Sequence, residues 1–393
     1  MPRASRPNYL LRVSRPKRGL RLLGILGLLS LAAAAWVYWE GRKQSNGGHY
    51  VSAPVATDAH VRRMIRLDGT NNGPGGNPST LPEVRILRRS DMSNLTARVE
   101  SQLRYDSFPR PVQNALEAQI AMARLGISSG SIDGRIGPQT RAALQAFQQK
   151  SALPITAELD AATKGKLLLC APPWLNYVVT TNDLARLQPL SKTWLGKSQQ
   201  TALDYETILE MLAERSEAHP ALLRKFNPGI NWSNVVAGTS VRIPDTTCPE
   251  APSKAAFVVI RLAGRVLEAF DPQTNLLAHF PCSIAQSFDK RPVGELHIQS
   301  IAPNPNYTFD PDVFPESAEA RELKTKLVLP PGPNNPVGVA WVGLDKPGYG
   351  IHGTPNPEQV GRTESHGCFR LANWNAEYLV RMVTVGMPVL VEP

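Results

Sequence analysis

Cysteine is rare in this chain, with four in 393 residues, and aromatic residues make up 7%. So few cysteines exclude a small disulfide-dense scaffold, in which covalent bridges replace a hydrophobic core. Charged residues are also scarce, at 19%, whereas 42% of the residues are hydrophobic, which excludes disorder along the whole chain. At about 150 residues per domain, the length predicts two or three domains.

Acidic residues are too few to balance the basic ones, and the surplus lies at one end. The chain has 43 Lys and Arg against 33 Asp and Glu, a formal net charge of +10. Residues 1–43 hold nine basic residues and one acid, Glu40, so they carry +8 of that charge and leave +2 for the rest. A basic tail does not make the body of a protein a nucleic-acid binder, so we expect no nucleic-acid partner.

A long apolar run, Leu22–Trp39, follows the basic tail of residues 1–21. Its eighteen residues are just long enough to span a bilayer as a helix, and the seven positive charges before it orient its N-terminus to the cytoplasm. We therefore expect a single transmembrane anchor in the inner membrane, residues 22–39, with the remaining chain on the periplasmic side. A cleaved signal peptide is the alternative, because Ala32-Ala33-Ala34 fits a small-x-small cleavage pattern.

Residues 40–110 are rich in Gly, Asn, Pro and Ser and lack sustained apolar periodicity, which is typical of a flexible stalk. Between residues 111 and 170, apolar residues at helical spacing predict three short helices, the second beginning at Pro138. Residues 176–247 predict a strand, two helices and a strand, a small α/β module.

Residues 255–393 predict a mainly-β domain, sandwich-like or barrel-like, with one packed helix. Two strand-like runs flank Ala263-Gly264, which is a hairpin signal, and further strand patterns lie on both sides of a Pro/Asn-rich insertion at residues 303–338. The one helical pattern is NWNAEYLVRMV, near the end. The chain is therefore expected to be a multidomain protein.

A segment near the C-terminus, IHGTPNPEQVGRTESHGCFRL, contains a nucleophile and a base. Cys368 follows Ser365-His366-Gly367, and His352 lies sixteen residues before it. A thiol attacks as the thiolate, and a nearby imidazole commonly takes the proton from the thiol. A glycine just before the cysteine leaves room for backbone N–H groups to face an oxyanion. A zinc site of His352, His366 and Cys368 would need a further ligand, and none is evident at ligand spacing, so we expect no metal.

This segment resembles the active-site signature of L,D-transpeptidases of the YkuD/ErfK type, in which His-Gly-Thr, a spacer and Ser-His-Gly-Cys-x-Arg follow in order. The resemblance covers residues 255–393 and includes GPNNPVG before the strand VAWVGL. It implies that Cys368 is the nucleophile, that His352 is its base and that the Gly353 carbonyl orients the imidazole. It also implies roles for residues near the cysteine: oxyanion N–H groups from His366, Gly367 and Cys368, and contacts to the loop or to a substrate carboxylate from Ser365, Arg362 and Arg370.

The implied reaction is acyl transfer in two steps, without metal or organic cofactor. Cys368 attacks the carbonyl on the L-configured side of an L,D-peptide bond in a peptidoglycan tetrapeptide stem, and an amine of another stem resolves the thioester to a 3→3 cross-link. If water resolves it, the chain is an L,D-carboxypeptidase; if the amine belongs to an envelope protein, the chain attaches that protein to peptidoglycan. A non-catalytic wall-binding tether is a further alternative, which the intact pair of His352 and Cys368 argues against.

The two upstream segments resemble wall-binding modules. Residues 111–170 resemble a three-helix peptidoglycan-binding domain through Ile132-Asp133-Gly134 and Gly137-Pro138-x-Thr140, with a helical spacer as the alternative. The second half of residues 176–247 resembles a LysM module, a glycan-binding fold, whereas the first half matches poorly. These resemblances imply peptidoglycan stems and glycan as partners. Because the signature lies wholly in the last domain, turnover of soluble stem peptides is expected not to need the two modules.

The remaining cysteines and histidines are interpreted by position. Cys170 and Cys248 flank the 176–247 segment, and we expect a disulfide between them in an exported chain. Cys282 lies in an apolar strand pattern and is expected to be buried and inert, whereas Cys368 is expected to stay reduced with a depressed pKa. No partner is evident in the sequence for five histidines, which are expected to be incidental: His49, His60, His219, His279 and His297.

Overall fold

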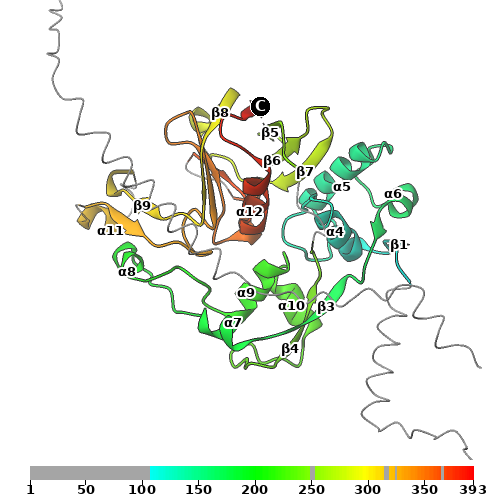
Figure 1. Ribbon diagram of the computed structural model, residues 1–393, viewed down its shortest axis with the longest axis horizontal. Coiled ribbons are helices and arrows are strands. Elements are labelled where there is room, and N and C mark those ends of the chain that lie inside the picture. Colours follow the sequence, from blue (N-terminus) through cyan, green and yellow to red (C-terminus); the bar gives the residue numbers. More distant parts are fainter. Residues whose placement is uncertain (1–106, 248–252, 314–317, 324, 364–366) are drawn as a thin grey trace, which may run out of the picture. The chain divides into compact units, whose positions relative to one another are not determined.

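The computed structural model describes residues 107–247, 253–313, 318–323, 325–363 and 367–393, all within one compact unit that spans residues 86–393 (Figure 1). The basic tail, the apolar run Leu22–Trp39 and most of the predicted stalk lie outside the described residues. Within the described part of the chain, no helix combines the length and the apolar character needed to cross a bilayer. The transmembrane anchor therefore stays a prediction.

Three helices and a two-residue ladder form the first described part, the helical bundle (Figure 1). Asn114 and Asp160 cap two of the helices by accepting hydrogen bonds from Glu117 N–H and Thr163 N–H, and Pro138 is the first residue of the third. The elements are β1 (Arg110–Pro111), α4 (Ala115–Ala123), α5 (Pro138–Lys150), α6 (Ala161–Lys166) and β2 (Leu168–Leu169), with β1 antiparallel to β2. The three predicted helices are confirmed.

The second part, residues 174–244, is the β-α-α-β module. β3 (Trp174–Val178) pairs antiparallel with β4 (Ser240–Pro244), and α9 (Ile208–Arg215) and α10 (Pro220–Phe226) lie between them in the chain, as predicted. Two short helices were not predicted: α7 (Thr181–Ala185) and α8 (Trp194–Ser198). A capping box of Thr180 and Asp183 begins α7, a local signal that the sequence contains. The LysM assignment of this module stays a prediction.

The C-terminal part is one eight-stranded sheet, a half-barrel rather than a two-sheet sandwich, with a helix packed on it (Figure 1). The strand order is β13-β12-β11-β8-β14-β5-β6-β7, in which β12–β13 and β14–β5 are parallel and the other pairs antiparallel. The strands are β5 (Phe257–Arg261), β6 (Val266–Phe270), β7 (Leu276–Pro281), β8 (Gly294–Pro303), β11 (Ala340–Leu344), β12 (Gly350–His352), β13 (Phe369–Arg370) and β14 (Pro388–Glu392). The helix is α12 (Asn373–Met382), at the predicted position.

The Pro/Asn-rich insertion forms a small hairpin beside this sheet. It contains the antiparallel strands β9 (Tyr307–Phe309) and β10 (Leu327–Leu329), with η2 (Pro311–Val313) and α11 (Ala318–Glu322) between them. Two further 3-10 turns lie elsewhere in the domain: η1 (Phe288–Lys290) and η3 (Pro357–Gln359).

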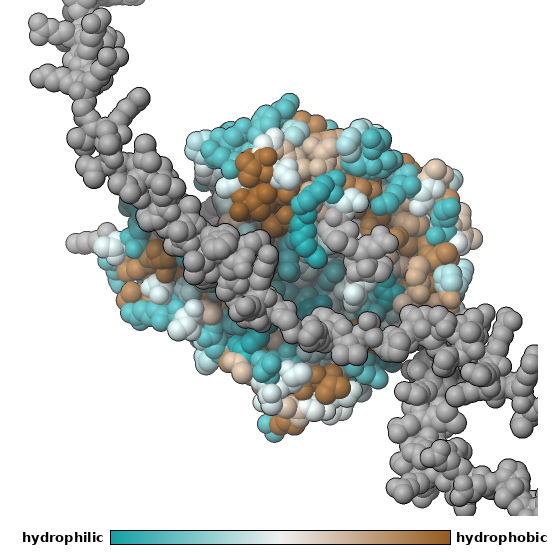
Figure 2. Space-filling view, in the orientation of Figure 1, coloured by the Kyte–Doolittle hydropathy of each residue, from teal (hydrophilic) through white to brown (hydrophobic). Residues whose placement is uncertain are grey.

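Strand alternation places the main core of the C-terminal domain between the sheet and α12. Val258 and Ile260 of β5 are fully buried and belong to one cluster with Leu379 and Met382 of α12, whereas Arg261 is exposed. On the surface in view, apolar residues form separate patches between polar ones (Figure 2). The buried apolar residues of this domain therefore hold the sheet against its helix.

A smaller core joins the β-α-α-β module to the insertion. Leu203 and Phe309 are fully buried in it, and the rings of Trp194 and Phe309 stack with centroids 4.3 Å apart. The backbone of Leu203 donates to the Pro331 carbonyl and accepts from Asn334 N–H, both at 2.9 Å. The module and the C-terminal domain therefore share both apolar packing and a backbone ladder.

A second contact joins the module to the start of α12. Asn373, 1% exposed, donates to the Glu214 carboxylate of α9 at 3.0 Å. Its side-chain oxygen accepts from Thr354 N–H at 3.0 Å and from Val339 N–H at 3.3 Å. Burial raises the pKa of Glu214 to about 7. Two such contacts argue against the expectation that turnover of soluble peptides does not need the module.

Leu203→Ala should destabilise the protein by about 3 kcal/mol, because it leaves a cavity in the core that the module shares with the insertion. Leu195→Ala is the matched control, since Leu195 lies in the neighbouring helix α8 and is 45% exposed. Denaturant unfolding followed by circular dichroism gives both free energies. Equal losses for the two variants would show that the shared core does not hold the parts together.

Glu214→Gln should change the pH dependence of stability. The raised pKa means that, between about pH 4 and about pH 7, the folded state keeps a proton that the unfolded chain has released. The stability contributed by this group is complete below that window and is lost as the pH rises through it. Because glutamine does not titrate, unfolding midpoints of the variant should fall less from pH 5 to pH 8 than those of the wild type. Parallel curves would contradict the prediction.

Candidate active site

The parallel pair β12–β13 brings the predicted nucleophile and base together. In its register His352 lies opposite Arg370. Residues opposite each other on neighbouring strands share a face of the sheet, and so do residues two apart on one strand. Cys368 lies directly before β13, and the charge of Arg370 acts on both Cys368 and His352, which places both groups near that guanidinium.

His352 is held by a carbonyl and an aromatic ring. Its Nδ1 lies 2.6 Å from the Gly353 carbonyl oxygen, and its ring stacks on Trp341 with centroids 5.6 Å apart. A carbonyl only accepts hydrogen bonds, so Nδ1 carries the proton and Nε2 of the neutral ring is left with its lone pair. The imidazole therefore presents a base at Nε2, in the orientation that the sequence predicted for the Gly353 contact.

Two glycines lie close to the reacting groups, one near the thiol and one beneath the ring that contacts His352. Cys368 Sγ lies 3.6 Å from the Gly348 carbonyl oxygen. A Cβ on Gly350 would lie 2.6 Å from the Trp341 indole, so the ring reaches His352 only because residue 350 lacks a side chain.

The electrostatics of the pair differ from the expectation. Burial lowers the pKa of His352 to about 4, and the charge of Arg370 acts in the same direction. Burial raises the pKa of the Cys368 thiol, although a backbone contact at Gly350 and the charge of Arg370 oppose the shift. The predicted depressed pKa of Cys368 is therefore wrong, because desolvation outweighs the nearby positive charge. At neutral pH both groups are therefore neutral, the one a thiol and the other an imidazole.

Tyr307 is a residue of the site that the sequence did not reveal. It lies on β9, and its phenol interacts electrostatically with Cys368 and Arg370, while burial raises its pKa. Tyr307 also belongs to the core shared with Leu203 and Trp194 of the module. The module therefore supports a side chain that faces the thiol. The residue lies in a Pro/Asn-rich stretch that gives no local signal for such a position.

The structure describes only some of the other predicted site residues. Ser365 and His366 lie outside the described residues, and Gly367 is half-buried next to Cys368. Arg362 is exposed and lies against the helical bundle, where it lines a crevice with residues of the bundle.

The remaining cysteines follow their predicted environments in part. Cys282 is completely buried, as predicted, and burial raises its pKa. Cys170 is an exposed free thiol in this structure, and its predicted partner Cys248 lies outside the described residues, so the bridge stays a prediction.

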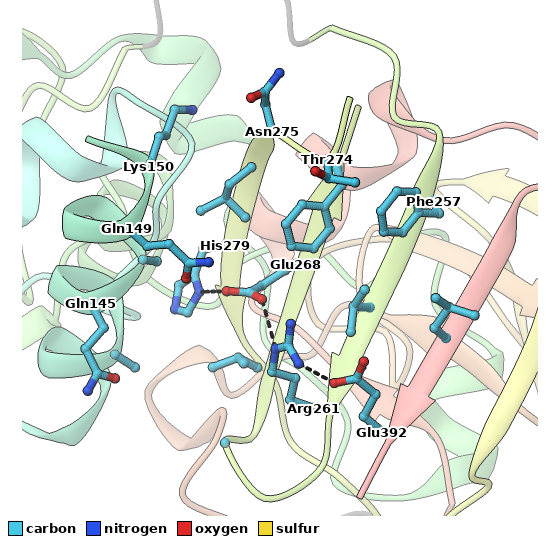
Figure 3. Close-up of a pocket in the computed structure, with 18 residues that line it drawn as sticks. Gln145, Gln149, Lys150, Phe257, Arg261, Glu268, Thr274, Asn275, His279 and Glu392 are labelled. Carbon is cyan, nitrogen blue, oxygen red and sulfur yellow. Dashed lines mark hydrogen bonds and ion pairs between the residues drawn. The ribbon is translucent and has the colours of Figure 1, made fainter. Parts of the chain in front are cut away.

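His279 has a partner, contrary to the interpretation that it is incidental. It lies opposite Glu268 in the sheet register, with its Nδ1 3.0 Å from the carboxylate, and Glu268 also contacts Arg261 (Figure 3). This group lines a crevice between α5 and the strands β5, β6, β7 and β14, at the other end of the strand order from β13. The crevice is therefore separate from Cys368. Two further histidines also have contacts: His219 caps α10, and His297 lies near Asp345 and Glu295.

Comparison with known proteins gives the same family for the C-terminal domain and a wall-binding family for the bundle. The L,D-transpeptidase catalytic domain model, YkuD, matches residues 255–391, and a peptidoglycan binding domain model matches residues 112–167. The L,D-transpeptidase ErfK/SrfK of Escherichia coli is 29% identical over 207 residues, which cover 52% of this chain and 66% of that protein. A solved L,D-transpeptidase from Mycobacterium smegmatis is 18% identical, with a TM-score of 0.28 and coverage of 41% of this chain and 76% of that one.

A relative from Bacillus licheniformis, the L,D-transpeptidase YkuD, is 30% identical over 189 residues, which cover 48% of this chain and 94% of that protein. Nearly the whole length of that relative is thus represented here. The residues that match the family model, 255–391, include His352, Cys368 and the strand pair β12–β13. The chain belongs to the L,D-transpeptidase family of the YkuD type.

Proposed function

We propose that this L,D-transpeptidase forms a thioester between Cys368 and a peptidoglycan tetrapeptide stem and passes the acyl group to an amine of another stem, giving a 3→3 cross-link. The observation that carries the proposal is the state of His352. Its Nδ1 is committed to the Gly353 carbonyl, and its lowered pKa leaves Nε2 free of a proton at neutral pH. A base in that state accepts the thiol proton at the moment of attack.

In the first step the Cys368 proton moves to His352 Nε2 while the sulfur forms a bond to the stem carbonyl carbon. The carbon–nitrogen bond to the terminal D-amino acid then breaks, and the proton on His352 passes to the departing amine. The product is a neutral thioester and a free D-amino acid. Because both groups start neutral, no separated charge has to be held in the resting site.

In the second step an acceptor amine attacks the thioester carbonyl. His352 takes a proton from the attacking nitrogen and returns it to the departing sulfur, which regenerates the thiol. Water in place of the amine would make the chain an L,D-carboxypeptidase, and an amine of an envelope protein would attach that protein to the wall. The three outcomes share one thioester, so the acceptor alone separates them.

Backbone N–H groups of His366, Gly367 and Cys368 are proposed to bind the oxyanion of each tetrahedral intermediate, on the strength of the Ser-His-Gly-Cys signature. Arg370 supports them electrostatically, since its charge interacts with both Cys368 and His352. Ser365 is proposed to hold the loop. No metal or organic cofactor is needed for any of these steps.

The rest of the chain is proposed to keep the enzyme at its insoluble substrate. The bundle matches a peptidoglycan-binding family, and the β-α-α-β order of the module supports the LysM-like assignment. Residues 22–39 are proposed to anchor the chain in the inner membrane, with the catalytic domain in the periplasm. Tethering of this kind raises the effective concentration of stems near Cys368.

Cys368→Ala should lower the turnover of soluble tetrapeptide stems by at least about 10³-fold, because it removes the nucleophile. Mass spectrometry of the products tests this, and the wild type should yield two joined stems that have lost one terminal D-amino acid. Cys170→Ala is the matched control, since Cys170 is exposed and outside the site. Turnover by Cys368→Ala at the wild-type rate would refute the nucleophile, and a purely hydrolysed product would identify a carboxypeptidase.

The rate of alkylation of Cys368 by iodoacetamide should increase with pH. Its midpoint should lie above about 8.5, the pKa of an ordinary cysteine, because burial raises the pKa of Cys368. Peptide mass analysis of samples quenched across about pH 6 to about pH 10 measures the midpoint. Arg370→Gln should move the midpoint further up, since the guanidinium charge lowers the thiol pKa. Complete labelling in mild acid would show that the thiol is instead activated at rest.

A further inference from the structure

A small crevice, lined mostly by residues with polar side chains, lies where the helical bundle meets the loop that leads to Cys368. It has a volume of about 310 Å³ and is lined by bundle residues between 119 and 140 and by Gly361 and Arg362. This volume lies at the lower end of the range of ligand pockets, which suits a ligand of a few residues rather than a polymer strand. It is distinct from the crevice of His279.

Two serine hydroxyls in the crevice have no hydrogen-bond partner. Ser129 is 4% exposed, and the Oγ atoms of Ser129 and Ser131 are both buried without a partner in the described residues. Buried polar atoms are nearly always paired in folded proteins, because an unpaired one has lost its hydrogen bonds to water without replacement. Two such atoms in one crevice indicate that a polar ligand forms the hydrogen bonds that they lack.

The charged groups at the crevice indicate the chemistry of that ligand. Arg135 and Arg362 both line it and are exposed, and Asp133 is the one carboxylate among the lining residues. Two guanidinium groups and two hydroxyl donors in one crevice favour a carboxylate, which accepts paired N–H groups. No lining residue is aromatic, so the crevice lacks the flat apolar surface on which a sugar ring would pack.

The walls of the crevice are fixed by hydrogen bonds before any ligand binds. Gln119, 1% exposed, accepts from Gly134 N–H at 2.8 Å and donates to the Asp133 carboxylate and the Thr140 hydroxyl, each at 3.1 Å. Across the crevice, the Gln139 amide donates to the Val360 carbonyl. A site already held in shape loses little entropy on binding.

The same loop connects the crevice to the site of Cys368. Gly361 N–H donates to the Ser283 hydroxyl at 2.8 Å, and the backbone of Ser283 exchanges hydrogen bonds of 2.9 and 3.0 Å with that of Arg370. Arg370 is the residue whose charge acts on Cys368 and His352. A ligand in the crevice would therefore be held on the framework that also positions the reacting groups.

We propose that this crevice binds the carboxylate end of a peptidoglycan stem peptide, a second stem that is not the one bonded to Cys368. The inference rests on the proposed function for the identity of the peptide. Arg135 and Arg362 pair with the carboxylate, and the Ser129 and Ser131 hydroxyls donate to the peptide. The bundle thereby recognises stem peptide rather than glycan, and it does so only together with the catalytic domain.

Calorimetric titration of the full chain with a soluble tetrapeptide stem tests the proposal, with Cys368 alkylated beforehand to block the reacting site. Arg135→Ala and Arg362→Ala should each weaken binding at least tenfold, and so should a peptide whose terminal carboxylate is replaced by an amide. Arg141→Ala is the matched control, because Arg141 is an exposed arginine of the same bundle that pairs with Glu158 outside the crevice. Its affinity should stay within about twofold of the wild type.

A tetrapeptide affinity that neither Arg135→Ala nor Arg362→Ala changes would overturn the proposal. So would binding of an N-acetylglucosamine oligomer that both substitutions abolish, since the ligand would then be glycan. Turnover of stems by the unblocked wild type separates this result from the proposed function. Normal turnover without crevice binding overturns the crevice alone, whereas crevice binding without any acyl transfer supports the crevice and refutes the reaction.

Discussion

The pairing of β12 with β13 is the constraint on which the site depends. Ile351 lies opposite Phe369 in this pair, and each is 1% exposed in the main core, so burial fixes the register. The alternate positions then carry His352 and Arg370 on the other face, with Cys368 two residues before Arg370. A slip of β13 by one residue would turn Arg370 into the core and bring Phe369 out of it, so the core and the site are specified by the same hydrogen bonds.

Local signals in the sequence predicted the elements but not their order in the sheet. Pro138 and the capping residues Asn114 and Asp160 mark helix starts through residues that are close in sequence. The hairpin β5–β6 likewise forms between two strands that are neighbours in sequence. The last strand, β14, instead lies in the middle of the sheet, parallel to β5 and antiparallel to β8. The sequence of β14 does not indicate which strands it pairs with. The active-site segment was recognisable because its residues are close in sequence, whereas Tyr307 lies 45 residues before His352.

The sequence did not lead us to predict that the β-α-α-β module supports the insertion, although the physical reason for this support lies in the residues of the insertion. The Pro/Asn-rich insertion holds Phe309 and Leu329, both fully buried in the structure, yet a stretch of this size with two three-residue strands has no core of its own. Its apolar side chains need a partner from elsewhere, and Leu203 and Trp194 of the module supply it. Domain boundaries drawn from composition assign each segment its own core, which is the assumption that fails here.

Arg370 acts on the two reacting groups in ways that oppose a resting ion pair. Its charge lowers the pKa of Cys368, which favours a thiolate, and it also lowers the pKa of His352, which disfavours the imidazolium that would accompany that thiolate. Burial disfavours both charged forms and dominates both shifts, so the pair rests neutral. In the proposed reaction, negative charge develops on the sulfur and then on the acyl oxygen, where a fixed positive charge is favourable. The proton on His352, repelled by the same charge, is readily released to the departing amine. Arg370 and burial therefore stabilise charge while bonds are changing and withhold that stabilisation from the resting site, which is the condition under which binding energy accelerates a reaction.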